Sequence, residues 1–155
     1  VVDLEGEKQV PLKEFWLGPG KTILKKGALL KEVIIPAAAL NSDSLYLRQV
    51  IRKSIDISLV NMAARLQLDK NNKIKLFRLA LGAVAPTPIR IYVAESMVEG
   101  KQMEDVNIDE IARIAANESK PIDDIRASAW YRRSLAEVLV QRGLKALGFS
   151  SGRCS

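Results

Sequence analysis

An alternation of apolar and polar residues in the middle of the chain predicts a β-hairpin. Between residues 60 and 68 every second side chain is apolar, and a period of two is typical of a half-buried strand. Residues 69–73 form the predicted turn, because their Asn residues tolerate the left-handed backbone of tight reversals. Residues 74–81 then return as a second strand. With a further strand expected at residues 45–51, these segments indicate an antiparallel sheet.

A period near 3.6 residues predicts helices after the strands. A short helix is expected at residues 92–98. A longer helix follows, and Asn107 and Glu110 form a plausible variant of the capping box at its start. Ile108 and Ile111 lie on the apolar face of this second helix. Strands that precede helices predict an α+β fold, with an antiparallel β-sheet and helices packed on one face.

The last long helix carries an apolar stripe about 100° wide. Its members recur at i, i+4, i+7 and i+8: Tyr131, Leu135, Val138 and Leu139. We expect this stripe to face the core, and Arg132 and Arg133 to point elsewhere. Ser128 is the expected N-cap, because its hydroxyl can accept from an amide of the first turn.

Composition bounds the class of protein. The chain has 155 residues, of which 48% are hydrophobic and 27% are charged, as in an ordinary globular domain. No apolar run approaches the roughly 20 residues that span a bilayer, so no membrane span is predicted. Residues 1–3 do not resemble a signal peptide, and we expect a cytoplasmic protein.

The chain contains no histidine and a single cysteine, Cys154. This composition excludes a His general base, a Ser-His-Asp or Cys-His nucleophile and the usual zinc sites. We therefore expect no catalytic residue and no metal site within this chain. Any redox chemistry must be carried by a bound organic cofactor or by another subunit.

Two further classes of ligand are weighed and set aside. A net charge of +6 suggests nucleic acid, but the basic residues are scattered and only 5% of residues are aromatic, so no nucleic-acid partner is predicted. The run Gly20-Lys21-Thr22 suggests a phosphate-binding loop. That motif needs a glycine five residues earlier, where this chain has Phe15.

Three phrases of the sequence carry a resemblance to a known family. The first runs from Pro11-Leu12 to Ile35-Pro36, the second is GAVAPTPIR at residues 82–90, and the third is RASAWYRRSLAEVL at residues 126–139. In this order they resemble the C-terminal domain of the FAD-binding (medium, flavoprotein) subunit of molybdenum hydroxylases, the carbon monoxide dehydrogenase and xanthine dehydrogenase family. Ala28 and Ala83 depart from the family pattern.

The resemblance implies a domain organisation. Residues 1–10 would be the tail of a preceding FAD-binding domain or a linker, residues 11–148 the flavoprotein C-terminal domain, and residues 149–155 a flexible tail. The family holds FAD mainly through loops of an upstream domain, and these loops are missing from this sequence. We therefore expect the natural chain to continue upstream of Val1.

The resemblance also implies three cofactor-binding residues. Leu30 would rest against the isoalloxazine ring, although leucine is also among the commonest core residues. Arg48 would lie where the family commonly has Lys near the flavin, and a cation there would stabilise negative charge on the reduced ring. Asp56 belongs to a charged phrase that forms a loop approaching the flavin. Its alternative role is to cap this loop or to pair with Arg52.

Two functions are compatible with these observations. The resemblance implies part of an FAD-binding subunit that covers the flavin and helps pass electrons from iron-sulfur clusters through FAD to an acceptor. Molybdopterin and 2Fe–2S clusters would lie in partner subunits, assembled as a dimer of heterotrimers. The alternative is a non-catalytic assembly module that docks the flavoprotein to the iron-sulfur and molybdenum subunits. In either case Arg126, Arg132 and Arg133 of the last phrase are expected on a solvated face or at a subunit contact.

Overall fold

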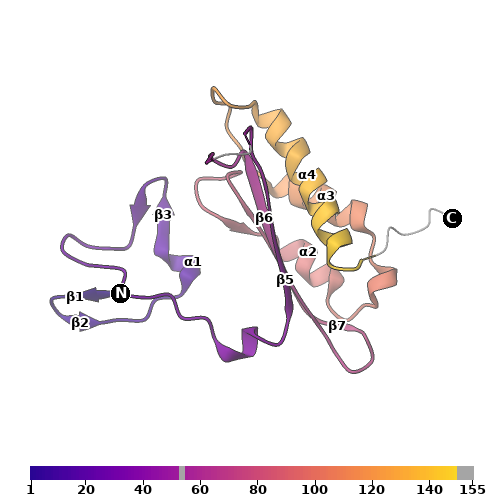
Figure 1. The fold of residues 1–155 in the computed structure, drawn as a ribbon, viewed down its shortest axis with the longest axis horizontal. Helices are drawn as coiled ribbons and strands as arrows, with labels where there is room; N and C mark the ends of the chain where they lie inside the picture. The colour runs from indigo at the N-terminus through magenta and orange to yellow at the C-terminus, as the bar shows by residue number, and fades with distance from the viewer. Residues whose placement is uncertain (53–54, 150–155) are drawn as a thin grey trace. The chain divides into compact units, whose positions relative to one another are not determined.

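The computed structural model describes residues 1–52 and 55–149, and the chain divides into two compact units (Figure 1). The first unit is Val1–Leu40 and the second begins at Asn41. Residues 1–10 thus group with the residues that follow them, because Val2 and Leu29 exchange backbone hydrogen bonds of 3.0 and 2.9 Å. This division differs from the expected boundary after residue 10. The assignment of residues 1–10 to a preceding FAD-binding domain remains a prediction.

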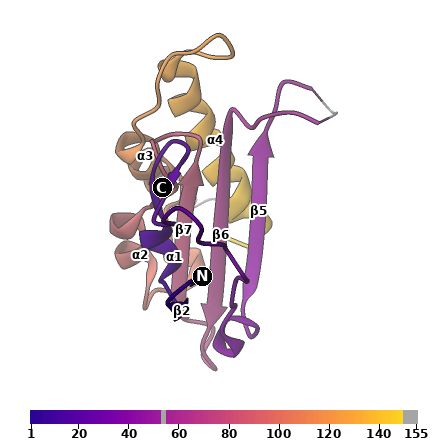
Figure 2. The same ribbon diagram turned by 90° about the vertical axis from the view of Figure 1, so that its left-hand side faces the viewer.

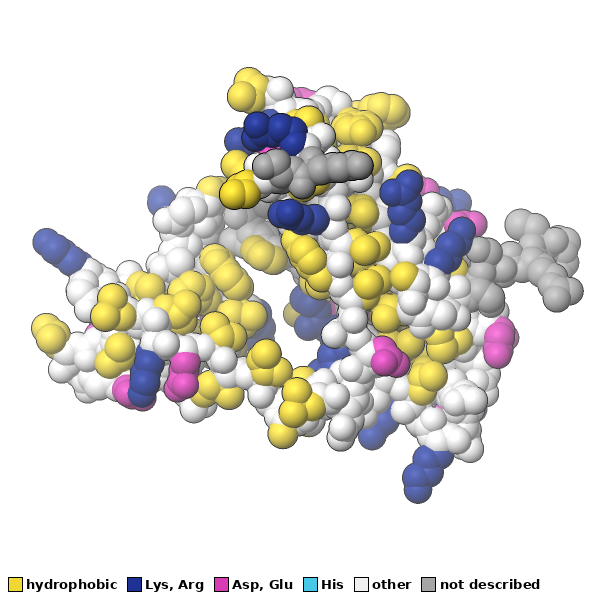
Figure 3. All heavy atoms as spheres, in the orientation of Figure 1, with side chains coloured by type: hydrophobic (Ala, Val, Ile, Leu, Met, Phe, Trp, Pro, Cys, Tyr) yellow, Lys and Arg dark blue, Asp and Glu magenta, His cyan; other side chains and the backbone are white. Residues whose placement is uncertain are grey.

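The first unit consists of short elements. They are β1 (Val2–Asp3), β2 (Gly6–Glu7), α1 (Leu12–Phe15), β3 (Trp16–Gly18), β4 (Lys21–Thr22) and the 3-10 helix η1 (Ala37–Ala39). In this unit, all of which the structure describes, Phe15 alone is buried. Large apolar side chains gather instead on its surface (Figure 3): Leu12, Leu17, Leu29, Leu30, Val33, Ile34 and Ile35. An exposed apolar surface of this kind is typical of a contact region.

The second unit is built on one antiparallel sheet with the strand order β5-β6-β7-β8 (Figures 1 and 2). The strands are β5 (Asp43–Gln49), β6 (Val60–Leu68), β7 (Ile74–Gly82) and β8 (Ile89–Arg90). Its helices are α2 (Tyr92–Val98), the 3-10 helix η2 (Met103–Asp105), α3 (Ile108–Glu118) and α4 (Ala129–Ala146). Figure 2 shows the helices together on one face of the sheet, so the predicted α+β fold is confirmed.

The hairpin of β6 and β7 forms as its alternation predicts. Val60, Met62, Ala64 and Leu66 are buried in the core, whereas Leu68 is only partly buried. The turn contains Asn72 in the left-handed region at φ 59°. Asp69 closes it by accepting hydrogen bonds from the backbone amides of residues 71 and 73, at 2.8 and 2.9 Å.

The predicted cap residues of both longer helices are confirmed. The Asn107 side chain accepts hydrogen bonds from the amides of Asp109 and Glu110, each at 3.1 Å, at the start of α3. The Ser128 hydroxyl accepts from the amide of Tyr131 at 3.2 Å at the start of α4. Each bond satisfies a first-turn donor that has no partner within the helix.

The predicted buried face of α4 is wrong for Tyr131 and Val138, whereas Leu139 of the predicted stripe is buried. The helix buries a different set: Arg132, Ala136, Leu139, Val140, Gly143 and Leu144. Tyr131 and Val138 of the predicted stripe are 44% and 36% exposed, and Leu135 is only partly buried. The cause is a close approach of helix to sheet, since a Cβ on Gly143 would lie 2.6 Å from Cε of Met62. The position that meets Met62 is therefore a glycine, and the buried face includes Gly143 while Tyr131 and Val138 lie outside it.

Phe149 does not belong to a flexible tail. It is 3% exposed, and its ring packs edge-on against the ring of Phe77, with 5.8 Å between the centroids. The hydrophobic core therefore continues past α4 to this residue. Residues 150–155, with the rest of the predicted tail and Cys154, lie outside the described residues.

Helix α2 covers the β7 edge with carboxylates. The strand β8 pairs only with Ala80 and Leu81, so the earlier part of β7 has no neighbouring strand among the described residues on this side. There Oε1 of Glu95 accepts from the amide of Leu79 at 3.0 Å, and Oε1 of Glu99 accepts from the amide of Phe77 at 3.3 Å. These oxygens take the place of a neighbouring strand as acceptors. Arg90 in turn donates to Glu95 through Nε and Nη2, both at 2.5 Å.

None of the described helices is long and apolar enough to cross a membrane.

Candidate functional site

The sheet has a second face, opposite the helices, and of the candidate residues Arg48 lies on it. We call it the outer sheet face. In three successive rows of the strand register it carries Ser44, Arg65 and Arg78, then Tyr46, Ala63 and Ala80, then Arg48, Asn61 and Gly82. The two alanines have short side chains, and Gly82 has none, because the side chain of Asn61 leaves no room for a Cβ there. These positions therefore project little above the sheet.

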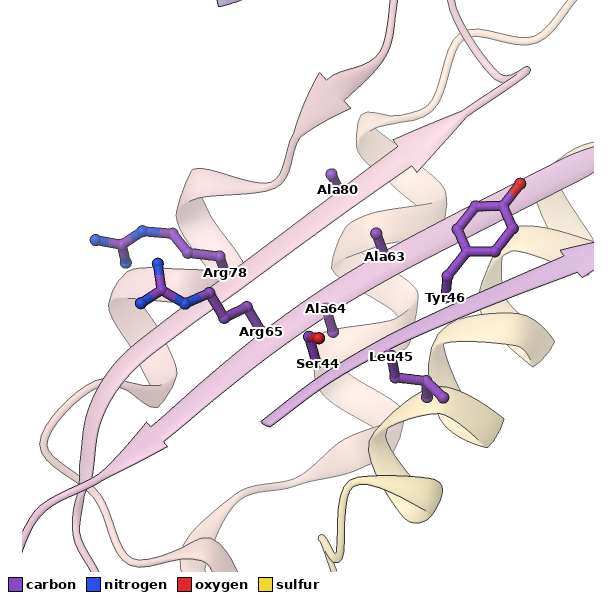
Figure 4. A pocket seen from close by; sticks show the side chains of 8 residues that line it. All are labelled: Ser44, Leu45, Tyr46, Ala63, Ala64, Arg65, Arg78 and Ala80. Carbon is purple, nitrogen blue, oxygen red and sulfur yellow. The ribbon is translucent and has the colours of Figure 1, made fainter. Parts of the chain in front are cut away.

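A shallow hollow of about 360 Å³ lies on this face (Figure 4). Its lining residues are Ser44, Leu45, Tyr46, Ala63, Ala64, Arg65, Arg78 and Ala80. Figure 4 shows Ala63 and Ala80 between the ring of Tyr46 and the guanidinium groups of Arg65 and Arg78. Small side chains flanked by an aromatic ring and cations suit contact with a flat, anionic or polar group.

Arg48 lies in the row of the outer sheet face next to Tyr46. Its side chain is exposed, and it makes no ion pair or hydrogen bond with the residues that the structure describes. Its opposite neighbour in β6 is Asn61, which carries no charge. The guanidinium is therefore available to a ligand, as the sequence prediction requires. Whether it contacts a flavin remains a prediction.

Asp56 lies in the loop that joins β5 to β6. Its Oδ2 accepts from the amides of Ile51 and Arg52 at 3.0 Å each, and its Oδ1 accepts from the amide of Ile57 at 2.9 Å. The Arg52 amide is the main cause of a lowered pKa for this carboxyl. These contacts are those of the alternative interpretation, in which Asp56 fixes the loop. Lys53 and Ser54 of the same phrase lie outside the described residues.

Leu30 belongs to the first unit, whereas Arg48 and Asp56 belong to the second. The side chain of Leu30 is 51% exposed, so within its own unit it is not a core residue. An exposed leucine in an apolar surface fits a contact with a cofactor or another domain. Its predicted role at the isoalloxazine ring remains a prediction.

The sequence prediction for Arg132 is wrong. Arg132 is 5% exposed, and its Nη1 donates to the backbone carbonyl of Leu59 at 2.6 Å. Its Nη2 donates to Oδ2 of Asp124 at 2.8 Å. Arg126 also contacts Asp124, at 3.3 Å, while Arg133 is exposed as expected. No periodicity marks Asp124 as the partner, because it lies eight positions earlier in a loop.

The carboxyl of Asp124 is held ionised by its surroundings. Hydrogen bonds from the Arg126 amide and from the Arg132 side chain lower its pKa from 3.8 to about 2. A depressed native pKa stabilises the fold at pH values above the unfolded pKa, and this contribution is lost as the pH falls through the native value. Asp124 is thus a pH-dependent link between α4 and the loop before it.

An Asp124→Asn variant should be less stable than the native chain above about pH 4. The difference in melting temperature should shrink as the pH falls towards about 2, where the native carboxyl is protonated. Thermal unfolding followed across this range measures it. Asp105→Asn is the matched control, because the Asp105 side chain is exposed and makes no hydrogen bond or ion pair with the described residues. A constant difference across the range would contradict the ionic role of Asp124.

Among the described residues, no three acidic, Cys or His side chains gather in a way that could hold a metal ion. The features of the site are two alanines flanked by Tyr46 and two arginines, the exposed guanidinium of Arg48, and the loop amides that Asp56 binds. None of these groups is arranged as a general acid, a general base or a nucleophile.

Comparison with known proteins defines the class. Residues 45–147 match the family of the CO dehydrogenase flavoprotein C-terminal domain, and the chain belongs to this family. The matched range begins within β5 and ends just after α4, so it corresponds to the second unit. The resemblance drawn from the three sequence phrases is confirmed.

Individual relatives agree with this assignment. The chain is 31% identical over 140 residues to the glyceraldehyde dehydrogenase medium chain of Sulfolobus acidocaldarius, covering 90% of this chain and 49% of that protein. It is 30% identical over 138 residues to a xanthine dehydrogenase FAD-binding subunit of Escherichia coli O157:H7, covering 88% and 47%. A carbon monoxide dehydrogenase structure from Hydrogenophaga pseudoflava superposes with a TM-score of 0.83 at 27% identity, covering 92% and 49%. The chain spans about half the length of these relatives.

Proposed function

We propose that this chain acts as the C-terminal part of the FAD-binding subunit of a molybdenum hydroxylase. In this role its second unit covers the flavin and helps pass electrons from iron-sulfur clusters through FAD to an acceptor. The observation that carries the proposal is an exposed Arg48, without a partner among the described residues, on the outer sheet face of a domain of the CO dehydrogenase flavoprotein family. The Escherichia coli relative is a xanthine dehydrogenase FAD-binding subunit.

The residues present fit a flavin unequally. Arg48 fits, because its charge has no partner among the described residues. Leu30 fits as an exposed apolar side chain in a unit that buries little of its own apolar surface. Asp56 does not fit a direct contact, because its two oxygens already accept from three backbone amides. We therefore propose that Asp56 serves the cofactor by fixing the loop that follows Arg48.

Bound FAD would supply the redox chemistry, since hydride and electron transfer of this kind is carried by a bound organic cofactor. Arg48 would stabilise negative charge that develops near the flavin on reduction. Because a guanidinium does not lose its proton, this stabilisation would persist at every working pH. The proposed partners are the iron-sulfur subunit and the molybdopterin subunit of a cytoplasmic complex, assembled as a dimer of heterotrimers.

A second candidate function is that of an assembly module without a direct role at FAD. It is favoured by exposed apolar side chains around the start of α4: Ile122, Ile125 and Trp130. Asp124 and the cap at Ser128 hold this segment in a defined conformation. A rigid segment that presents large apolar side chains is typical of a protein–protein contact.

Arg48→Ala in the native complex distinguishes the two functions. The proposal predicts a flavin reduction potential lower by about 20–30 mV, because a lost cation interaction of about 1 kcal/mol disfavours the reduced flavin. Spectroelectrochemical titration of the flavin measures the shift. Arg142→Ala on α4 is the control, since it removes an equal charge from an exposed position in the helical layer. An unchanged potential in the Arg48 variant would favour the assembly module.

A further inference from the structure

The loop between β5 and β6 is tied to the fold at its base. The amide of Leu59, the last residue before β6, donates to the carbonyl of Gln49, the last residue of β5, at 2.8 Å. The carbonyl of the same Leu59 accepts from Nη1 of Arg132 at 2.6 Å. The loop that follows Arg48 therefore closes on a peptide that α4 holds from the helical layer.

The guanidinium that makes this contact is itself held in one orientation. Its Nη2 donates to Asp124 at 2.8 Å, and Asp124 accepts from the amides of Arg126 and Ala127 at 2.8 and 3.1 Å. A planar guanidinium makes two directed bonds from a rigid fork, which an ammonium group cannot reproduce. The direction of the bond to Leu59 is thus set by an ordered carboxylate.

Stability alone is a weak reason for this arrangement. Burying a guanidinium is costly, and a buried ion pair is often no better than apolar packing. Nε of Arg132 is also buried without an acceptor among the described residues, which adds to the cost. What the arrangement achieves is a fixed position for one backbone carbonyl. Asp56 binds described amides on both sides of it in the loop, and Arg132 holds the carbonyl of Leu59 at the end of the loop.

We propose that Arg132 is a positioning residue for the flavin-facing loop: through the Leu59 carbonyl it holds the β5–β6 loop, and with it Arg48, in place towards the cofactor. The inference rests on the proposed function, because it takes this loop to face FAD. It adds a buried residue of α4, on the opposite face of the sheet from Arg48, to those that determine the behaviour of the flavin.

Arg132→Lys in the native complex tests the inference. The lysine keeps the charge but cannot reach both Leu59 and Asp124 with the same fork. Amide hydrogen exchange at Ile57 and Leu59 should become about tenfold faster, because one charge-assisted hydrogen bond is lost. Amides in the centre of the β6–β7 hairpin should be unchanged. The flavin reduction potential should shift in the same direction as in Arg48→Ala.

The matched control is Arg133→Lys, the same exchange at the next residue, whose side chain is exposed. It should change neither loop exchange nor the flavin potential. If Arg132→Lys does not fold, Asp124→Asn replaces it, because that variant leaves Arg132 and its bond to Leu59 in place but frees its orientation. Asp124→Asn should also give faster amide exchange in the loop and a shifted flavin reduction potential, both smaller than in Arg132→Lys.

The outcomes separate this inference from the proposed function. Unchanged loop exchange in the variant would overturn the positioning role. Faster exchange with an unchanged flavin potential would also overturn it, while a shifted potential in Arg48→Ala would leave the proposed function intact. An unchanged potential in both Arg48→Ala and Arg132→Lys would overturn the proposed function and the inference together.

Discussion

Replacing Phe77 with alanine is expected to lower the free energy of unfolding by about 4 kcal/mol. Phe77 has no exposed surface and lies among the core side chains between the sheet and the helices. Its removal loses the transfer free energy of a whole ring and leaves a cavity that the surrounding strands cannot close. It also removes the edge-on contact with Phe149, a kind of contact worth about 1 kcal/mol beyond burial.

Denaturant unfolding of the Phe77→Ala variant measures this loss, with an unchanged slope as the sign of two-state behaviour. Tyr131→Ala is the matched control, because this aromatic ring is 44% exposed and its loss should cost less than about 1 kcal/mol. Phe149→Ala should cost at least about 2 kcal/mol, since its ring is buried against Phe77. A loss at Phe149 as small as that at Tyr131 would restore the expectation of a flexible tail.

A large effect is also expected for Glu95→Gln, about 2 kcal/mol. Glu95 is buried and accepts two hydrogen bonds from Arg90, one from each of Nε and Nη2. This carboxylate is the main cause of a raised pKa for Arg90. Glutamine can still accept from the Leu79 amide but leaves the guanidinium without its counter-charge. The loss falls below that of a fully buried pair, because Arg90 is partly open to solvent.

Glu99→Gln is the comparison for this prediction. Glu99 also accepts from a β7 amide and pairs with Arg78, but both side chains of this pair are 38% exposed. Its loss should cost less than about 1 kcal/mol. Urea unfolding of the two variants measures the difference. Equal losses would show that the buried pair at Glu95 adds nothing beyond the contact with the strand.

The strands and the order of elements could be predicted from the sequence, because the burial of one sheet face against the helices alone produces the alternation of apolar and polar residues. In β6 each apolar residue that alternates with a polar one meets the helices, so Val60, Met62 and Ala64 are buried where the period of two places them. The cap at Asn107 was equally readable, since it depends on the residues of one turn. Local chemistry decides both features.

The buried face of α4 could not be predicted, because it depends on distant partners. Its inner face contains Arg132 and Gly143, which a search for apolar side chains ignores. Arg132 is acceptable there because it bonds to Leu59 and Asp124, and Gly143 because Met62 leaves no room for a Cβ. Neither partner is visible in a helical period, so the pattern selected Tyr131 and Val138 instead.

The candidate site likewise contains residues that the sequence indicates and residues that only their distant partners reveal. Family phrases pointed to Arg48 and Asp56, and both residues lie in the second unit. The Arg48 side chain is exposed without an ion pair to any described residue, and Asp56 accepts from three backbone amides. The buried pair of Arg132 and Asp124 left no signal, because each residue looks like an ordinary surface charge. Only the fold brings them to the base of the loop.

The bond between Arg132 and Leu59 joins residues 73 positions apart, and this separation sets an order of events during synthesis. The β6–β7 hairpin closes through a turn of a few residues and can form as soon as its strands leave the ribosome. The loop that follows Arg48 has by then been translated, but it cannot reach its final attachment until α4 has emerged. A newly made chain therefore completes the attachment of this loop last, after its sheet is already in place.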